Sequence, residues 1–321
     1  MEAPELNKIY QGDVLEVLKT WPDEFIDCIV TSPPYWGLRD YGVDGQFGLE
    51  KTPEEYVAKS VEIFRECKRV LKKDGTLWLN LGDSYNGNGF SGGGYSDANE
   101  VSTLKPKDLV GIPWRVAFAL QADGWYLRQD IIWAKPNPMP ESVTDRCTKS
   151  HEYIFLMAKS KDYYFDNEAI KEKSVGSDPR MIDGFVPKSI NGKHKDDPQN
   201  SANRKKYEKT MAGGGSSMIN HNGYFTEDGE AIGTPGMRNK RDVWTVTTSP
   251  YPDAHFATFP QGLIVPMIKT TKPDAIILDP FMGSGTTAFV ARSLGRKYLG
   301  IELNPAYIKL AERRLAQKVL F

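Results

Sequence analysis

The chain has 321 residues, of which 40% are hydrophobic, and its formal net charge is −1 at pH 7. This length allows one large α/β domain with an insertion, or two modest domains. Because the total charge is close to zero, any surface for nucleic acid must come from local clusters of basic residues. The odd number of cysteines, Cys28, Cys67 and Cys147, argues against a disulfide framework and favours a reduced, intracellular protein.

The sequence gives no sign of secretion, membrane attachment or a metal site. Its first residues do not show the basic region followed by an apolar stretch that is typical of a signal peptide. No run approaches the roughly 18 apolar residues that cross a bilayer. The histidines His151, His194, His221 and His255 are scattered without the spacing of metal ligands. We therefore expect a soluble, cytoplasmic protein without a bound metal.

Apolar runs rich in β-branched residues alternate with segments of helical periodicity, which predicts an α/β fold. In chain order we expect a strand at 26–31, a helix at 53–71, a strand at 76–81, a helix at 114–122, strands at 131–134, 153–157 and 275–278, a helix at 286–294, a strand at 297–301 and a helix at 305–319. Residues 72–75 would close the helix at 53–71. Since most strands lead through a loop to a helix, the sheet should be doubly wound, mostly parallel and buried on both faces.

Two segments break this alternation. Residues 86–104 are polar and rich in glycine, which is typical of a surface loop. Residues 169–240 lack sustained periodicity, and loops of this length inside compact domains are seldom without function. We therefore expect residues 1–168 and 241–321 to form one domain, into which residues 169–240 are inserted as a smaller region.

The segment at 275–287 has the pattern of a nucleotide-cofactor site. An apolar strand ends at Asp279, a turn with Gly283 and Gly285 follows, and a helix begins directly after it. Glycines let the backbone approach a ligand, and a helix N-terminus offers free N–H groups. The next strand ends at Glu302, whose carboxylate suits the two hydroxyls of a ribose. Because Asp279 would repel a phosphate and attract an α-amino group, the pattern favours S-adenosylmethionine over a dinucleotide.

A second motif, Ser32-Pro33-Pro34-Tyr35, follows the strand at 26–31. Two prolines fix φ and remove two backbone donors, which leaves carbonyl oxygens and the Ser32 hydroxyl as acceptors. The Tyr35 ring beside them can stack on a flat group. Such a cup suits a planar ring with an amino substituent, and the four residues alone are also compatible with a proline-stiffened turn and a core tyrosine.

Taken in order, the motifs resemble the amino-methylating DNA methyltransferases, in the permuted class whose catalytic motif precedes the cofactor motif. The matching segments cover most of the chain: QGD at 11–13, TSPPY at 31–35, RQDIIW at 128–133, HFATFP at 255–260, DPFMGSGTT at 279–287 and GIELNPAY at 300–307. The resemblance implies a Rossmann-like enzyme that uses S-adenosylmethionine and acts on double-stranded DNA. It leaves residues 169–240 without a counterpart, where this family keeps its target-recognition region.

The resemblance also implies roles for residues at the matching positions. Ser32, Pro33, Pro34 and Tyr35 would hold a flipped base and its amino group. Asp13 would accept from the adenine amino group of the cofactor, and the segment at 255–260 would close over its methionine end. The cofactor-binding residues implied are Asp13, Thr258, Asp279, Pro280, Phe281, Gly283, Ser284, Gly285, Thr286, Glu302 and Asn304.

The choice of base also comes from the resemblance. In this family, serine before Pro-Pro is associated with N4 of cytosine, and aspartate or asparagine with N6 of adenine. We therefore expect methylation of cytosine N4 by base flipping and direct in-line transfer. Methylation of cytosine C5 needs a thiolate, typically after proline, and none of the three cysteines follows a proline. An adenine N6 methyltransferase, a methyltransferase for RNA or protein, and a non-catalytic DNA-binding module remain open alternatives.

Basic residues gather in the inserted region. Between Lys188 and Lys209 there are seven basic residues against three acidic ones. We predict that Arg204, Lys205 and Lys206 contact DNA, as phosphate anchors or, for the arginine, as a reader of guanine. A cognate restriction endonuclease is a candidate partner, and the sequence leaves the oligomeric state open.

Overall fold

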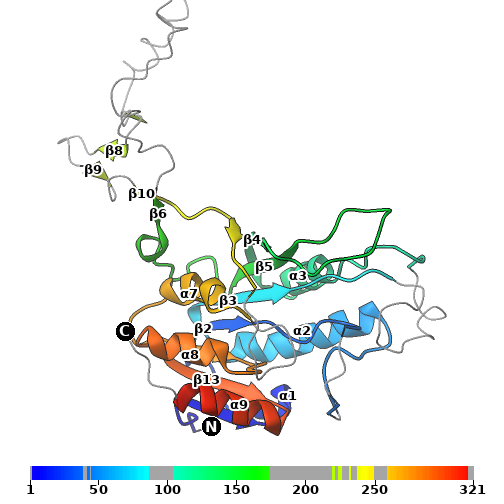
Figure 1. Cartoon of the computed structure of the whole chain (residues 1–321). Coiled ribbons are helices and arrows are strands. Elements are labelled where there is room, and N and C mark those ends of the chain that lie inside the picture. The colour runs from blue at the N-terminus through cyan, green and yellow to red at the C-terminus, as the bar shows by residue number, and fades with distance from the viewer. Residues whose placement is uncertain are drawn as a thin grey trace, which may run out of the picture. The chain divides into compact units, whose positions relative to one another are not determined.

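The computed structural model describes residues 2–38, 42–43, 45–86, 104–173, 219–220, 223–225, 231–232, 237–248 and 259–316. The chain divides into two compact units, one formed by residues 1–169 with 241–321 and the other by residues 170–240. Figure 1 shows the first unit as a sheet flanked by helices. Within the described ranges, every helix is too short or too polar to cross a membrane.

The described part of the first unit is built on a sheet of eight strands in the order β1-β13-β12-β2-β3-β5-β4-β11. The strands are β1 (Lys8–Gln11), β2 (Ile26–Thr31), β3 (Leu71–Leu81), β4 (Tyr126–Ala134), β5 (His151–Ala158), β11 (Val243–Thr245), β12 (Ile276–Asp279) and β13 (Lys297–Glu302). Neighbours from β1 to β3 are parallel, β5 is antiparallel to both of its neighbours, and β11 is parallel to β4. The carboxyl ends of β1, β13, β12, β2 and β3 therefore lie at one edge of the sheet, together with the amino end of β5.

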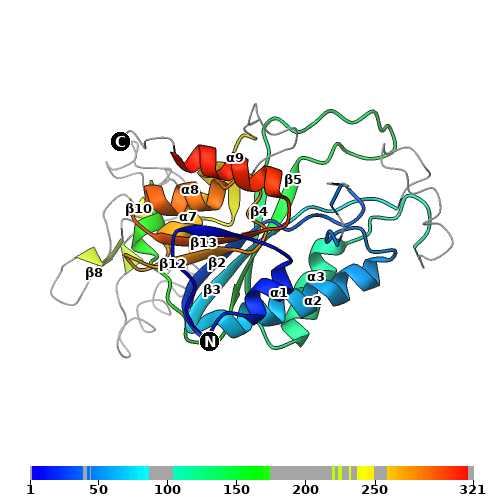
Figure 2. The same ribbon diagram turned by 90° about the horizontal axis from the view of Figure 1, so that it is seen from below.

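Helices cover both faces of this sheet. Figure 2 shows α1, α2 and α3 on one side and α7, α8 and α9 on the other. Their bounds are Val14–Lys19, Pro53–Val70 and Ile112–Ala122 for the first three, and Gln261–Lys269, Thr286–Ser293 and Pro305–Ala316 for the last three. Local signals set the start of α2: the Thr52 side chain accepts a hydrogen bond from the backbone N–H of Glu55 at 3.1 Å, and Pro53 occupies the first turn.

Side chains alternate between the two faces along each strand. In β5, Phe155 and Met157 pack among the side chains of α1, α2 and α3, whereas Ile154 and Leu156 pack among those of α7, α8 and α9. Trp78 in β3 lies on the second side, with its ring centroid 6.0 Å from that of Trp244. The sheet is thus buried on both faces, as the apolar runs predict.

The second unit is described in part. The short helix η2 (Glu168–Ile170) leads into β6 (Glu172–Lys173), which pairs antiparallel with β10 (Met237–Arg238). The Nε atom of Arg238 donates to Glu172 at 3.0 Å beside this pairing. The other described strands, β7 (Ile219–Asn220), β8 (Gly223–Phe225) and β9 (Ala231–Ile232), form a small antiparallel sheet.

The elements differ from the sequence prediction in three respects. The sheet is mostly parallel as predicted, but β5 runs antiparallel because residues 135–150 form no helix and return directly to the neighbouring position. Helix α2 ends at Val70, so Leu71, predicted as its last residue, and residues 72–75, predicted to close it, belong to β3. The sequence does not predict β1, α1, α7 or β11, since three of these have six residues or fewer and Pro266 interrupts the pattern of α7.

The turn between β12 and α8 depends on glycine. Gly283 and Gly285 have φ angles of 52° and 79°, in the left-handed region that side chains disfavour. A Cβ atom on Gly285 would lie 2.7 Å from the Cβ of Ala311 in α9. The absence of a side chain therefore lets α8 begin directly after the sheet edge and lets α9 pack against its start.

We expect Gly285→Ala to lower the free energy of unfolding more than Gly295→Ala. Both glycines have left-handed backbones, with φ of 79° and 71°, so each alanine costs about 1–2 kcal/mol in backbone strain. At Gly295 no described atom lies within 4 Å of an added Cβ, whereas at Gly285 the overlap with Ala311 costs about 1–3 kcal/mol more. Urea unfolding followed by tryptophan fluorescence measures both variants, and equal losses would contradict this packing.

Candidate active site

A cavity of about 620 Å³ opens at the edge where β1, β13, β12, β2 and β3 end. Its lining comes from the residues that follow these strands, from the end of β4 and from the start of β5. In doubly wound sheets, ligands bind in the crevice outside the carboxyl ends of the strands. The cavity is therefore the place where the fold itself favours a ligand.

Most site residues predicted from the sequence line this cavity. They are Asp13, Ser32, Pro33, Pro34, Tyr35, Asp279, Pro280, Phe281, Gly283, Ser284, Thr286, Glu302 and Asn304. Gly285 instead begins α8, where it faces Ala311. Thr258 and the three basic residues Arg204, Lys205 and Lys206 lie outside the described residues.

Asp279, the last residue of β12, is 3% exposed, and three hydrogen bonds hold its carboxylate. Its Oδ1 atom accepts from Thr31 Oγ1 at 2.7 Å and from the backbone N–H of Phe281 at 3.0 Å. Its Oδ2 atom accepts from Thr287 Oγ1 at 2.7 Å. Burial raises the pKa of Asp279 to about 6, in spite of these bonds. The carboxylate thus ties together the end of β2, the turn after β12 and the start of α8.

Glu302, the last residue of β13, joins the two neighbouring strand ends. Its Oε2 atom accepts from the backbone N–H of Gly283, and its Oε1 atom accepts from that of Asn304, both at 2.8 Å. Burial raises the pKa of Glu302 as well. The two carboxylates give this half of the cavity a negative charge with fixed positions.

An aromatic wall stands beside these carboxylates. The Phe281 ring stacks on Phe47 with centroids 5.7 Å apart, and Phe47 stacks on Tyr56 at 4.5 Å.

Asp13 lies between β1 and α1 and caps the start of α1. Its Oδ1 atom accepts from the backbone N–H of Leu15 at 2.9 Å and from that of Glu16 at 3.1 Å. This half of the cavity therefore combines an aromatic face with acceptors for hydrogen bonds.

The residues after β2 form the other half. Tyr56 in α2 donates its hydroxyl to the Pro34 carbonyl at 2.9 Å, which holds the Pro-Pro segment in place. The Tyr35 hydroxyl lies 3.2 Å from Ser32 Oγ. A Cβ atom on Gly82 would lie 2.5 Å from the Tyr35 ring, so glycine after β3 makes room for this ring. Ser32 and Tyr35 are thereby fixed side by side.

Glu152 in β5, with Asn80 and Lys135, also lines this half and was not predicted from the sequence. The Tyr35 hydroxyl donates to Glu152 Oε2 at 2.7 Å, and Asn80 Nδ2 donates to the same oxygen at 3.1 Å. Lys135 forms an ion pair with Glu152 Oε1. Burial and then the charge of Glu152 raise the pKa of Tyr35 well above its usual value, so the phenol keeps its proton. No local motif marks Glu152, because only the antiparallel course of β5 brings it to this edge.

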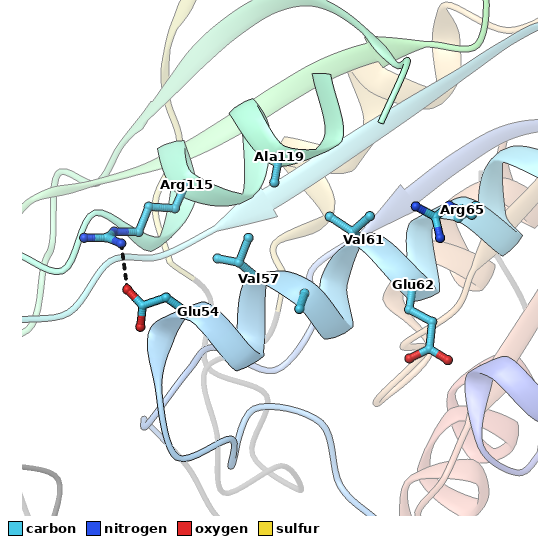
Figure 3. Close-up of a pocket in the computed structure, with 8 residues that line it drawn as sticks. Glu54, Val57, Val61, Glu62, Arg65, Arg115 and Ala119 are labelled. Atoms are coloured by element: carbon cyan, nitrogen blue, oxygen red, sulfur yellow. Dashed lines mark hydrogen bonds and ion pairs between the residues drawn. The ribbon is translucent and has the colours of Figure 1, made fainter. Parts of the chain in front are cut away.

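A second hollow, of about 470 Å³, lies between α2 and α3 and away from the sheet edge (Figure 3). Val57, Val61 and Ala119 line it with apolar atoms. One ion pair, of Arg115 with Glu54 at 3.1 Å, stands at its end. Of its other charged residues, Glu62 and Arg65, the arginine is paired with Asp123. None of the site residues predicted from the sequence lines this hollow, so the chemistry is assigned to the cavity at the sheet edge.

Comparison with known proteins gives a consistent result. The profile of the N6/N4 family of DNA methylases matches residues 26–313. The type II methyltransferase M.Cfr9I of Citrobacter freundii is 44% identical to this chain, over 98% of the chain and 90% of the relative.

Two solved structures share the fold at low sequence identity. The PvuII DNA methyltransferase, described as cytosine-N4-specific, superposes with a TM-score of 0.62 at 18% identity and covers 99% of this chain and 89% of its own. A DNA modification methylase of Thermus thermophilus, solved with S-adenosyl-L-methionine, gives a TM-score of 0.57 at 21% identity, over 96% and 93%. The α/β fold predicted from the sequence is confirmed.

The family match covers most of the chain and the strand ends that form the cavity. The curated relative matches almost the whole length of both proteins. This protein therefore belongs to the N6/N4 family of S-adenosylmethionine-dependent DNA methyltransferases.

Proposed function

We propose that this enzyme methylates N4 of cytosine at a specific sequence in double-stranded DNA, as the modification partner of a restriction endonuclease. The observation that carries the proposal is the position of the Ser32 to Tyr35 cup beside the Asp279 turn. The hydrogen bond from Thr31 to Asp279 holds the two motifs at one sheet edge. A base in the cup would therefore lie next to a cofactor on the turn.

The donor set of the cavity suits S-adenosylmethionine. This cofactor carries positive charge at its sulfonium and amino groups, and the carboxylates of Asp13, Asp279 and Glu302 line the cavity. Each Glu302 oxygen accepts one backbone N–H and retains a lone pair for a ribose hydroxyl. The Phe281 ring offers a face to the adenine. When bound here, the cofactor supplies an electrophilic methyl group.

The remaining cofactor residues shape the pocket wall. They are Pro280, Gly283, Ser284, Thr286 and Asn304, with Asp13 as acceptor for the adenine amino group and Gly285 at the start of α8 behind this wall. Thr258 completes the proposed set from outside the described residues. Gly283 adds no side chain to this wall, which lets the ligand approach the backbone.

The target base must leave the duplex to reach the cup, at a cost of a few kcal/mol. Stacking on Tyr35 returns about 1–3 kcal/mol of this cost. Ser32 Oγ and the Pro33 carbonyl accept hydrogen bonds from the amino group, which turns the nitrogen lone pair towards the methyl group. Holding these atoms in line contributes roughly 7–11 kcal/mol by orientation. The nitrogen becomes acidic once methylated, so the reaction needs no strong general base.

Two observations favour the amino group of cytosine. Burial raises the pKa of Cys28 to about 12 and raises that of Cys67 as well, so neither supplies the thiolate that methylation of C5 requires. Serine stands before Pro-Pro in this chain, and the structurally similar PvuII enzyme is described as cytosine-N4-specific. Adenine N6 is the alternative that the product test below distinguishes.

For DNA recognition we propose the segment 169–240, with Arg204, Lys205 and Lys206 as contacts. In the cofactor half of the cavity the carboxylates of Asp279 and Glu302 repel phosphate, and Lys135 in the other half is already paired with Glu152. We therefore expect the cations for the DNA backbone in a more basic part of the chain, and these three residues belong to its most basic stretch. The curated relative is a type II methyltransferase, which supports pairing with a restriction enzyme.

We expect the affinity for S-adenosylmethionine to rise by about tenfold from pH 5 to pH 7, as the Asp279 carboxyl ionises through its pKa of about 6. The sign follows from charge: a cationic ligand binds the ionised carboxylate better, so affinity is lost as pH falls below the pKa of the free enzyme. In Asp279→Asn most of this rise in affinity should disappear, and only the smaller rise from the ionisation of Glu302 should remain. Isothermal titration calorimetry at several pH values measures it, and identical pH profiles for both proteins would contradict the assignment.

Ser32→Ala should slow methyl transfer at least tenfold and leave the affinities for cofactor and DNA within twofold of the parent. The reason is that the serine orients the amino group and contributes little to binding. Cys147→Ala, at an exposed cysteine, is the control and should keep the parent rate. Mass spectrometry of digested product DNA should detect N4-methylcytosine. Detection of 5-methylcytosine would refute the mechanism, and N6-methyladenine would refute only the base.

Neutralising Arg204, Lys205 and Lys206 together should weaken DNA binding and flatten its dependence on salt. Each lost phosphate contact lowers the slope of log K against log salt by about 0.9. Lys8→Gln with Lys297→Gln is the control, because these residues begin β1 and β13 at the sheet edge opposite the cavity. Binding measured by fluorescence anisotropy across a salt titration decides the matter: parental behaviour of the triple variant would exclude this segment as the DNA surface.

A further inference from the structure

A continuous chain of polar groups runs from the cup into the sheet. Ser32 Oγ lies 3.2 Å from the Tyr35 hydroxyl, which lies 2.7 Å from Glu152 Oε2. Lys135 forms an ion pair with the other oxygen, Oε1. Asn80 Nδ2 donates to Glu152 Oε2 at 3.1 Å and to the carbonyl of Tyr153 at 3.0 Å. The side chains of Lys135 and Glu152 are 19% and 14% exposed, so solvent screens their interaction weakly.

The direction of the hydrogen bonds along this chain follows from the number of protons. A tyrosine hydroxyl has one proton to donate. The carboxylate of Glu152 is the strongest and nearest acceptor, at 2.7 Å, whereas Asn80 Oδ1 is 3.4 Å away. The Tyr35 proton therefore points to Glu152. The contact between Ser32 and Tyr35 must then run the other way, with Ser32 donating its proton to the phenol oxygen.

We propose that Glu152 is a positioning residue that keeps Ser32 Oγ an acceptor towards the target amino group. The inference rests on the proposed function of the cup and adds the residue that sets the direction of its hydrogen bonds. With its own proton turned to Tyr35, Ser32 presents only lone pairs to the amino N–H. If the chain ran in reverse, Tyr35 would donate to Ser32, and the serine proton would be free to point at the amino group and repel it.

Lys135 fixes the orientation of the Glu152 carboxylate, on which the direction of these hydrogen bonds depends. Its ammonium group holds Oε1 of Glu152 by an ion pair, which leaves Oε2 towards Tyr35. In Glu152→Gln, the cation would hold the amide oxygen in the same way. The amide NH₂ would then face Tyr35 and donate to its hydroxyl, so the tyrosine would turn its proton to Ser32. The same NH₂ would no longer accept from Asn80 Nδ2, which keeps its bond to the carbonyl of Tyr153. The isosteric substitution is thereby expected to reverse the chain at the cost of this one hydrogen bond.

Glu152→Gln should slow single-turnover methyl transfer at least tenfold. Calorimetry and fluorescence anisotropy should give affinities for S-adenosylmethionine and for DNA within twofold of the parent, since Glu152 acts through Ser32 and only on the reacting amino group. The assay uses tritiated S-adenosylmethionine with genomic DNA from a host that lacks this enzyme. Glu66→Gln is the matched control, because Glu66 is also a partly buried carboxylate paired with a cation, Arg69, but lies in α2 away from the cavity.

A double-mutant cycle separates positioning through Tyr35 from a merely structural role. Tyr35→Phe keeps the stacking ring and removes the hydroxyl, so it should also slow transfer at least tenfold. Once the hydroxyl is absent, Glu152→Gln should have no further effect, and the double variant should equal Tyr35→Phe within twofold. Multiplicative effects of the two substitutions, or a parental rate in Glu152→Gln, would overturn the proposal. If Glu152→Gln does not fold, Tyr35→Phe alone decides, since a parental rate in that variant excludes the chain.

The identity of the methylated base and the result of the double-mutant cycle are independent of each other. If the parent enzyme produces N6-methyladenine, the cytosine proposal fails, while the coupling between Glu152 and Tyr35 is still measured on the same DNA. If the parent produces N4-methylcytosine and the two substitutions act independently, the inference on Glu152 fails alone.

Discussion

The sheet edge that carries the candidate active site depends on one buried hydrogen bond, from Thr31 Oγ1 to Asp279 Oδ1 at 2.7 Å. The two residues end the central strands β2 and β12, at the start of the two motifs proposed to hold the base and the cofactor, although 248 positions separate them. Asp279 also accepts from Thr287, so the same carboxylate fixes the start of α8. Because a buried carboxylate without partners is costly, the folded chain must keep the cup and the turn at this one separation.

The electrostatics of the cavity follow from the same burial. Ionised carboxylates at the ends of β12 and β13 are held in a poorly solvated edge, which raises the pKa of both Asp279 and Glu302. Such an edge favours a ligand that brings positive charge and hydroxyl donors, and it disfavours phosphate. This physical preference agrees with a family that uses S-adenosylmethionine.

The antiparallel direction of β5 brings a charged residue to the cup. If all strands were parallel, the amino end of β5 would lie at the opposite edge, far from the cup. Because β5 is antiparallel to β3, its first residues reach the carboxyl edge and bring Glu152 to Tyr35. The loop between β4 and β5 forms no helix, and this allows Lys135, directly after β4, to pair with Glu152 across the two strands. The change of strand direction thus supplies Glu152 to the proposed catalytic cup, beside Lys135 from the carboxyl end of β4.

The sequence by itself determined the family, the α/β fold and the residues at the strand ends. It could do so because each of these is a local signal: an apolar strand, then a short motif such as Ser32 to Tyr35 or Asp279 to Gly285. The tertiary structure alone decided the direction of β5, the partners of Asp279 and the place of Glu152 in the site. Strand direction is set by how the chain connects two neighbouring strands in space, and hydrogen-bond partners far apart in the chain are set by register. Neither leaves a pattern in the residues that are adjacent along the sequence.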